Sequence, residues 1–306
     1  MDGRVVTEIV WLASYPKSGN TWLRILIANL FAADGRPVDI NNLNERGVIA
    51  SDREEFDEIL MLDSGLLTPD EAASLRPRVH DEIAKGPGRD RPEDAGVGPL
   101  RVRFVKVHDA YTLTSGGEPL LAGRRGAKGA IVIVRDPRDI AASVANHYRL
   151  SIDDAVALLN DRAIAQAESR DSQPQQLRQK LLGWSGHIAS WLDQDDIPVH
   201  LVRYEDLQSD AVSAFSAAMA FAGLSVSRED AVRTAGNSEF SKIRSQERDK
   251  GFREWLDRRD GEFFFRRGVA GGWRDELDIG QVKRIEAANA AMMRRLGYEL
   301  TASNDC

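Results

Sequence analysis

Three short segments of the chain contain side chains that bind anions or transfer protons. The first, Lys17 to Thr21, combines a lysine with a serine, a glycine, an asparagine and a threonine. The second places Lys106 two residues before His108, and the third begins at Arg135. Cationic and hydroxyl side chains bind phosphate-like groups, and histidine can accept a proton near neutral pH. These residue types predict a reaction on a bound anionic ligand.

The first segment is expected to form a phosphate-binding turn between a strand and a helix. It follows the apolar run Ile9–Ala13 and opens the helical pattern Thr21–Ala33. The N–H groups at a helix N-terminus favour an anion, and Gly19 lets the backbone approach a ligand closely. The patterns Gly-x-x-x-x-Gly-Lys-Ser/Thr and Gly-x-Gly-x-x-Gly are absent, which disfavours a common nucleotide triphosphatase or a dinucleotide dehydrogenase. The alternative is a helix cap at Ser18 or Asn20 beside a surface lysine.

These segments would be positioned by an α/β fold. Short apolar runs rich in β-branched residues predict four buried strands, namely Ile9–Ala13, Val102–Val107, Ala130–Val134 and Val199–Val202. Helical patterns include Thr21–Ala33, Pro69–Ala84, Pro137–Arg149, Ile152–Glu168, Gln175–Leu192 and Val282–Leu296. Strands that alternate with helices indicate a central parallel sheet flanked by helices. We therefore expect a single α/β domain over residues 1–306.

The ends of the strands decide which of these side chains can reach a ligand. Arg135 directly follows a predicted strand, and open α/β sheets bind ligands at the carboxyl ends of their strands. Asp136 and Pro137 need no functional explanation, because an aspartate cap and a proline in the first turn are typical of a helix start. Lys106 and His108 lie on the same side of their strand, since side chains alternate along it. A lone histidine after a strand is usually structural, so spacing alone does not assign a role to His108.

The overall composition narrows the classes of protein. The net charge of −7 argues against general binding to nucleic acid, which needs a basic surface. The best apolar run, Trp22 to Ala33, contains Arg24 and is too short to cross a bilayer. The N-terminal residues carry charge early and show no signal peptide. The single cysteine, Cys306, cannot form a disulfide within the chain, so we expect a cytoplasmic protein. No cluster has the spacing of zinc or calcium ligands, so no metal is expected.

Two of the anion-binding segments match known motifs closely. The string Tyr15 to Trp22 resembles the 5′-phosphosulfate loop of the cytosolic sulfotransferases that use 3′-phosphoadenosine 5′-phosphosulfate (PAPS). Asn20 stands where many members of that family carry threonine. Lys106 to His108 is similar to the Lys-Thr-His segment of the same family, in which the histidine is the general base.

Two later segments extend the resemblance. Arg135 to Ser143 is similar to the segment of the family that binds the 3′-phosphate. Arg266 to Arg274 resembles the closing motif Arg-Lys-Gly-x-x-Gly-Asp-Trp-Lys, with Gly272 and Arg274 as departures from it. The chain is thereby identified as a bacterial member of the family, which implies the P-loop-like sulfotransferase fold.

The resemblance also implies a role for each segment, with PAPS as the sulfuryl donor and no metal. The 5′-phosphosulfate would be held by Lys17, Ser18, Gly19, Asn20 and Thr21, and Trp22 would pack against the adenine. The 3′-phosphate would be bound by Arg135, Ser143, Arg266, Arg267 and Gly268. Tyr204, Ser238 and Phe240 would contact the adenine as well. His108 would be the general base, and Lys17 and Lys106 would stabilise the transferred group.

The acceptor pocket and any oligomer contact are expected outside the segments that resemble the family. It does not extend to residues 34–101 and 150–195, which are expected to line the pocket for a small-molecule hydroxyl or amine. The lysine-threonine-valine dimer motif of the family is absent after Arg274, so an oligomer would use another surface. Two rivals stay open: a kinase or nucleotide hydrolase on a related phosphate-loop fold, and a non-catalytic nucleotide-binding protein. The first would need a Walker lysine, and the second would have lost the histidine or lysines that are present.

Two stretches interrupt the regular pattern. Gly86–Pro99 is rich in glycine and proline, so it is expected to be a mobile loop. Ser245–Arg267 is dense in charges of both signs, which is typical of a solvated surface. The alternative is a lid whose basic end closes over an anion, and the resemblance of the closing motif favours that lid.

Overall fold

The computed structural model describes residues 6–32, 34–43, 49–85, 100–168, 173–255 and 262–301. Its strands are β1 (Val6–Ser14), β2 (Leu100–Val107), β3 (Gly129–Val134), β4 (Ala165–Gln166), β5 (Gln179–Lys180) and β6 (Val199–Arg203). Its α-helices are α1 (Asn20–Leu30), α2 (Arg53–Leu60), α3 (Pro69–Lys85), α4 (Pro137–Tyr148), α5 (Ile152–Asn160), α6 (Gly183–Leu192), α7 (Tyr204–Ser209), α8 (Ala211–Phe221), α9 (Arg228–Asn237), α10 (Phe240–Lys250) and α11 (Ile279–Arg295). The expected mobile loop Gly86–Pro99 lies outside the described residues.

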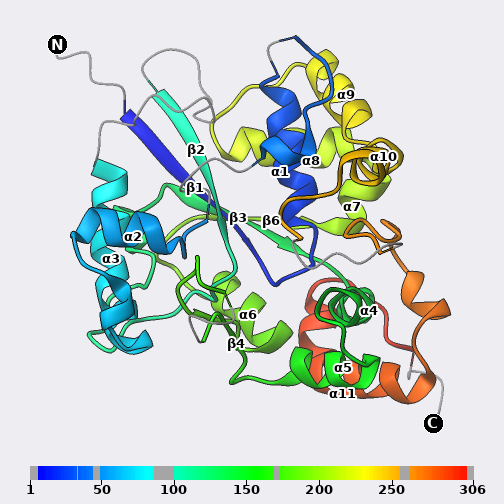
Figure 1. Ribbon diagram of the computed structural model, residues 1–306. Coiled ribbons are helices and arrows are strands. Elements are labelled where there is room, and N and C mark those ends of the chain that lie inside the picture. The colour runs from blue at the N-terminus through cyan, green and yellow to red at the C-terminus, as the bar shows by residue number, and fades with distance from the viewer. Residues whose placement is uncertain are drawn as a thin grey trace. The chain divides into compact units, whose positions relative to one another are not determined.

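A four-stranded sheet in the order β2-β1-β3-β6 forms the centre of the α/β fold (Figure 1). β1 pairs in parallel with both β2 and β3, so that Leu12 lies opposite Lys106 on one side and Ile131 on the other. Every residue of β3 is buried, which is typical of a strand in a parallel sheet covered on both faces. The four strands predicted from the sequence are confirmed, and with them the α/β fold with a central parallel sheet.

The chain forms two compact units, each assembled from separate stretches of sequence. The first unit takes its described residues from 1–15, 46–133 and 161–201, and the second takes them from 16–45, 134–160 and 202–306. The sheet therefore belongs to the first unit, apart from the last residue of β3 and the last two residues of β6. The single domain expected from the sequence stays a prediction.

Large side chains fill the core of the first unit. Trp11 of β1 packs edge-on against His80 of α3, with 5.3 Å between the ring centroids. Arg76, also of α3, forms a fully buried ion pair with Asp109 at 2.7 Å. The backbone carbonyl of Asp109 accepts a hydrogen bond from the indole N–H of Trp191 in α6 at 3.1 Å. Asp109 therefore has a structural role, which ties α3 and α6 to the residues after β2.

The second unit consists of packed helices (Figure 1). α4, α5 and α11 pack against one another, and α1 packs against α9, which also contacts α8. α11 begins with a capping box, in which Asp278 and Gln281 each accept a hydrogen bond from the backbone N–H of the other. A cluster of buried apolar residues includes Ile25 of α1, Ile243 of α10 and Phe252, which follows α10.

The predicted helix Ile152–Glu168 is wrong in its second half. α5 ends at Asn160, and the carboxylate of Asp161 accepts a hydrogen bond from the N–H of Ala163 at 2.8 Å. Such an aspartate turn offers the backbone an alternative to the next helical hydrogen bond. β4 follows this turn, so the second half of the pattern forms a turn and a two-residue strand in place of a helix.

The predicted helix Gln175–Leu192 is wrong in its first half. α6 starts only at Gly183, and residues 179–180 form β5, which pairs antiparallel with β4. Leu182 separates the two elements with a φ of 62°, a left-handed conformation that a right-handed helix cannot include. The start of the helix is therefore set by a backbone feature that periodicity does not reveal.

The other predicted helices, Thr21–Ala33, Pro69–Ala84, Pro137–Arg149 and Val282–Leu296, are confirmed to within a few residues as α1, α3, α4 and α11. α2, α7, α8, α9 and α10 are not among the predicted helices. In α10 the buried residues are Ile243 and Glu247, too few apolar positions to give a stripe. The charged stretch Ser245–Arg267 thus begins inside a helix, and its residues 256–261 lie outside the described residues.

Two buried histidines of the first unit make its stability depend on pH. Burial lowers the pKa of His187 to about 3 and holds the pKa of His80 well below its usual value. An unfolded histidine has a pKa of about 6.5. Below that pH the unfolded state binds protons that the folded state does not, so the free energy of unfolding decreases as the pH falls.

We expect His187 alone to reduce the free energy of unfolding by about 1.4 kcal/mol between pH 7.5 and pH 5.5. Urea unfolding of the wild type and of His187→Leu at both pH values measures this share. The wild type should lose more stability than the variant by about that amount. An equal loss in the two proteins would show that His187 is protonated in the folded state.

Candidate functional site

The turn between β1 and α1 has the backbone conformation of an anion-binding loop. Lys17 and Gly19 both adopt positive φ values, 69° and 106°, with Ser18 between them. Alternation of this kind directs successive N–H groups into a concave nest that binds anions. The Ser18 hydroxyl is buried and makes no hydrogen bond to any described residue. Gly19 occupies the cap position of α1, so neither Ser18 nor Asn20 is the helix cap.

Tyr204, the first residue of α7, lies against this loop. A Cβ atom at Gly19 would lie 2.6 Å from Cδ2 of Tyr204, so only glycine fits there. The ring of Trp22 meets the Tyr204 ring edge-on at 5.4 Å, and the guanidinium of Arg135 lies 4.2 Å from its centroid. Burial raises the pKa of Tyr204, which keeps its phenol neutral. We call Gly19, Trp22, Arg135 and Tyr204 the Tyr204 cluster.

The residues expected to contact the adenine extend this cluster. The indole N–H of Trp22 donates a hydrogen bond to the backbone carbonyl of Ser238 at 2.9 Å. The hydroxyl of Ser238 accepts one from the amide of Asn29 in α1 at 3.0 Å, and Ser238 is fully buried. Phe240, at the start of α10, packs so closely on Gly268 that a Cβ there would lie 2.1 Å from Cδ2 of the ring.

The two arginines of the closing motif point to acidic residues. Arg266 donates to the carboxylate of Glu276 at 2.9 Å. Arg267 donates to Glu276 and to Asp275, both at 3.0 Å. A ligand phosphate would therefore compete with the two carboxylates for these guanidinium groups.

The backbone of the closing motif is held from three sides. Asp139 of α4 accepts hydrogen bonds from the N–H groups of Gly271 and Trp273 at 2.7 and 2.9 Å. Gln208 of α7 makes two more hydrogen bonds to backbone groups of the same segment, at 2.6 and 2.7 Å. Arg135 donates to a further carbonyl of the segment at 2.9 Å. The residue after β3 and the closing motif are thereby fixed to each other.

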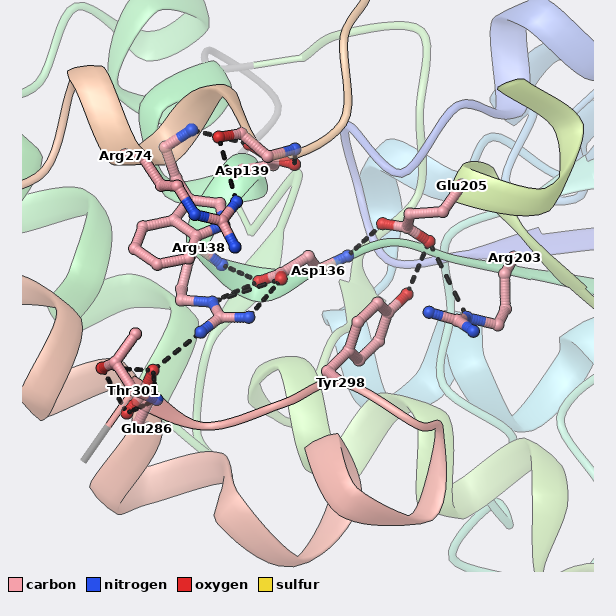
Figure 2. A network of polar contacts seen from close by, with 11 residues as sticks. Asp136, Arg138, Asp139, Arg203, Glu205, Arg274, Glu286, Tyr298 and Thr301 are labelled. Atoms are coloured by element: carbon pink, nitrogen blue, oxygen red, sulfur yellow. Dashed lines mark hydrogen bonds and ion pairs between the residues drawn. The ribbon is translucent and has the colours of Figure 1, made fainter. Parts of the chain in front are cut away.

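A buried ion network lies at the start of α4 (Figure 2). Arg138 donates to Asp136 at 2.6 Å and to Glu286 of α11 at 2.7 Å, and all three residues are buried. Glu286 also accepts hydrogen bonds from the N–H and the hydroxyl of Thr301, each at 3.0 Å. The guanidinium of Arg138 lies 4.2 Å from the centroid of the Trp273 ring. Arg138 thus connects α4, α11 and the closing motif.

His108 follows β2 in the first unit, and its contacts fix the position of its proton. Nδ1 lies 2.8 Å from the backbone carbonyl oxygen of Ser14. A carbonyl oxygen can only accept, so Nδ1 carries the hydrogen, and the lone pair of the neutral ring is on Nε2. Nε2 is therefore the nitrogen that can take a proton from a ligand. Lys106, two residues earlier, is half-buried near the end of β2.

The structure brings most of the predicted co-substrate residues together in the second unit. The phosphate loop, Arg135, Tyr204 and Ser238 are joined by direct contacts, and Gly268 and Phe240 contact each other. Ser143 is half-buried in α4. Lys106 and His108 belong to the first unit.

Asp139 and Gln208 are functional candidates that the sequence analysis did not select. Asp139 stands in the string that begins at Arg135, so a check of every polar residue in the motif could have included it. Nothing in the sequence indicated Gln208, because its role depends on a segment about sixty residues further along the chain.

An α/β sheet whose first turn has the backbone conformation of an anion-binding nest, with an arginine directly after a neighbouring strand, is typical of phosphate-binding proteins. Residues 127–297 match the family model described as the sulfotransferase domain. That match covers more than half of the chain, so the chain belongs to the sulfotransferase family. The matched range contains Arg135, Tyr204 and the closing motif, whereas the phosphate loop and His108 lie before it. The bacterial origin expected from the sequence stays a prediction.

The curated relative sulfotransferase 6B1 of Danio rerio is 25% identical over 182 residues, which cover 56% of this chain and 55% of the relative. The chain thus spans about half the length of that relative. Among solved structures, mouse sulfotransferase SULT7A1 complexed with PAP aligns with a TM-score of 0.56 and 19% identity over 95% of this chain and 86% of that chain. Retinol dehydratase in complex with androsterone and inactive cofactor PAP aligns with a TM-score of 0.57 and 21% identity over 97% of this chain and 83% of that chain. At these identities the structures show a shared fold.

Two searches of the described residues gave negative results. None of the described helices is long and apolar enough to cross a membrane. The described residues also contain no group of three or more histidine, cysteine, aspartate or glutamate side chains that could hold a metal ion.

Proposed function

We propose that this chain transfers the sulfuryl group of PAPS to a hydroxyl or amine of a small-molecule acceptor. The observation that carries the proposal is the Tyr204 cluster. One tyrosine ring contacts the phosphate loop at Gly19, the indole of Trp22 and the guanidinium of Arg135. A loop for one anion and an arginine for a second, joined by aromatic rings, suit a nucleotide that carries separate phosphates at its 5′ and 3′ positions.

In the proposed site, the phosphate loop holds the 5′-phosphosulfate and Arg135 holds the 3′-phosphate. The buried Ser18 hydroxyl would gain a partner in the bound anion, since a buried polar group without one is costly. Trp22 and Tyr204 would pack against the adenine, and Ser238 would act by fixing Trp22. Arg266, Arg267 and Ser143 would complete the 3′-phosphate site. PAP, 3′-phosphoadenosine 5′-phosphate, is PAPS without its sulfuryl group. The PAP bound to SULT7A1 and to retinol dehydratase supports this choice of nucleotide.

The proposed reaction is an in-line displacement at sulfur. The acceptor oxygen or nitrogen forms a bond to the sulfur while the bond from sulfur to the 5′-phosphate oxygen breaks. The acceptor proton passes to Nε2 of His108, and PAP leaves with the negative charge on its phosphate oxygen. Lys17 and Lys106 stabilise the charge that develops on the bridging and sulfuryl oxygens. Catalysis then depends on positioning and electrostatics, as in phosphoryl transfer.

Transfer of labelled sulfur tests the proposal. The purified chain is incubated with PAPS carrying labelled sulfur and with one phenol, one alcohol and one amine. We expect the label to move to at least one acceptor class, with release of PAP. A parallel incubation with ATP labelled at the γ-phosphate and magnesium tests the kinase alternative. Transfer from ATP without transfer from PAPS would refute the proposed function.

A further inference from the structure

A buried carboxylate in α10 has no part in the reaction proposed above. Glu247 is 0% exposed. Its two oxygens accept hydrogen bonds from the backbone N–H groups of Phe264 and Phe265, at 2.6 and 3.0 Å. A carboxylate is buried at a high cost unless hydrogen bonds compensate it. The two bonds therefore fix the backbone just before the closing motif to α10.

The ring held in this way lies beneath a lysine of the phosphate loop. Nζ of Lys17 is 3.4 Å from the centroid of the Phe264 ring, well within the range of a cation–π contact. The ring itself packs against Phe252 and Phe265, with centroid distances of 4.8 and 5.1 Å, and against His147 at 5.7 Å. Its position is thus determined by neighbours on several sides.

We propose that Phe264 is a positioning residue for Lys17, and that Glu247 acts through it by holding the ring in place. A lysine side chain has several rotatable bonds, so ordering it costs conformational entropy. An aromatic face attracts the ammonium without neutralising it. The Phe264 ring therefore adds an attraction that holds the Lys17 side chain at the phosphate loop. The catalytic part of this inference rests on the proposed function.

Three variants separate this role from packing. Phe264→Leu keeps an apolar side chain but removes the ring, and we expect kcat to fall roughly 3- to 30-fold, the range that a cation–π contact of this kind represents. Phe264→Tyr keeps the ring and should restore most of the lost rate. Phe215→Leu is the matched control, because Phe215 is a buried phenylalanine of α8 to which we assign no role in the site. Its kcat should stay near that of the wild type, and thermal unfolding checks that all three variants fold.

The contact can also be measured without turnover. Reductive methylation with labelled carbon gives each lysine a methyl signal in the NMR spectrum, and Lys17→Arg identifies the signal of Lys17. The ring current of Phe264 should shift this signal upfield in the wild type and in Phe264→Tyr, but not in Phe264→Leu. A Lys17 signal at the position of an exposed lysine, unchanged in Phe264→Leu, would overturn the inference.

The two measurements also distinguish this inference from the proposed function. A wild type that transfers sulfuryl groups, with Phe264→Leu at the wild-type kcat, would overturn the positioning role alone. A wild type that shows the shifted Lys17 signal but transfers no sulfuryl group would refute the proposed function and still support the contact.

Discussion

Replacing His108 with glutamine should lower kcat about 100- to 10,000-fold, the usual contribution of a general base. Nδ1 of His108 lies 2.8 Å from the carbonyl oxygen of Ser14, which leaves Nε2 as the basic nitrogen. Glutamine can still donate a hydrogen bond to that carbonyl, but it has no nitrogen that accepts a proton at neutral pH. The rate is measured as PAP release with an acceptor that the wild type uses, and PAP affinity is measured by calorimetry.

PAP affinity should be unchanged in His108→Gln, because none of the proposed nucleotide contacts involves His108. His200→Gln is the matched control, since His200 is a half-buried histidine of β6 to which we assign no role in the reaction. Its kcat should stay close to that of the wild type. A His108→Gln enzyme with nearly full kcat would exclude His108 as the general base.

Replacing Glu286 with alanine should reduce the free energy of unfolding by about 1–3 kcal/mol, the cost of leaving a buried hydrogen-bond donor without its acceptor. Arg138 is 4% exposed and lies between Asp136 and Glu286, so the substitution leaves its guanidinium with one carboxylate (Figure 2). Thr301 loses the acceptor for its N–H and hydroxyl in the same step. Urea unfolding measures the difference, because the free energy is linear in the urea concentration.

Lys250→Ala is the matched control for Glu286→Ala. Lys250 pairs with Asp39 at 2.7 Å, a distance like that between Arg138 and Glu286, but the lysine side chain is 58% exposed. A solvent-exposed pair contributes at most about 1 kcal/mol. A Glu286→Ala variant no less stable than Lys250→Ala would show that the buried network does not stabilise the second unit.

The sequence could predict the elements whose burial pattern is regular. β3 is buried along its whole length, and the apolar run that forms it is visible in the sequence. α10 is different, because one of its two buried residues is Glu247, whose burial depends on hydrogen bonds to residues 17 and 18 positions further on. β4 and β5 have two residues each and exist through their pairing with each other. Elements of this kind are determined by tertiary contacts, which no local pattern encodes.

The candidate site likewise combines features that local sequence predicts with contacts that only the folded chain creates. The spacing of Lys17, Ser18 and Gly19 between a strand and a helix was sufficient to predict an anion-binding turn, and its backbone has the expected conformation. The contacts of Asp139 and Phe264 join segments that are far apart in the sequence, so they were not predictable from spacing. The acidic partners of the closing motif also became visible only in the folded chain.

Calorimetric titration of PAP is the measurement that tests the central claim most directly. PAP should bind the wild type in a saturable manner, and Arg135→Ala should weaken it roughly 10- to 100-fold, as expected for the loss of a hydrogen bond to a charged group. Adenosine 5′-phosphate, which lacks the 3′-phosphate, should bind more weakly and should not distinguish the variant from the wild type. Absence of PAP binding to the wild type, with binding of ATP and magnesium in its place, would contradict the account.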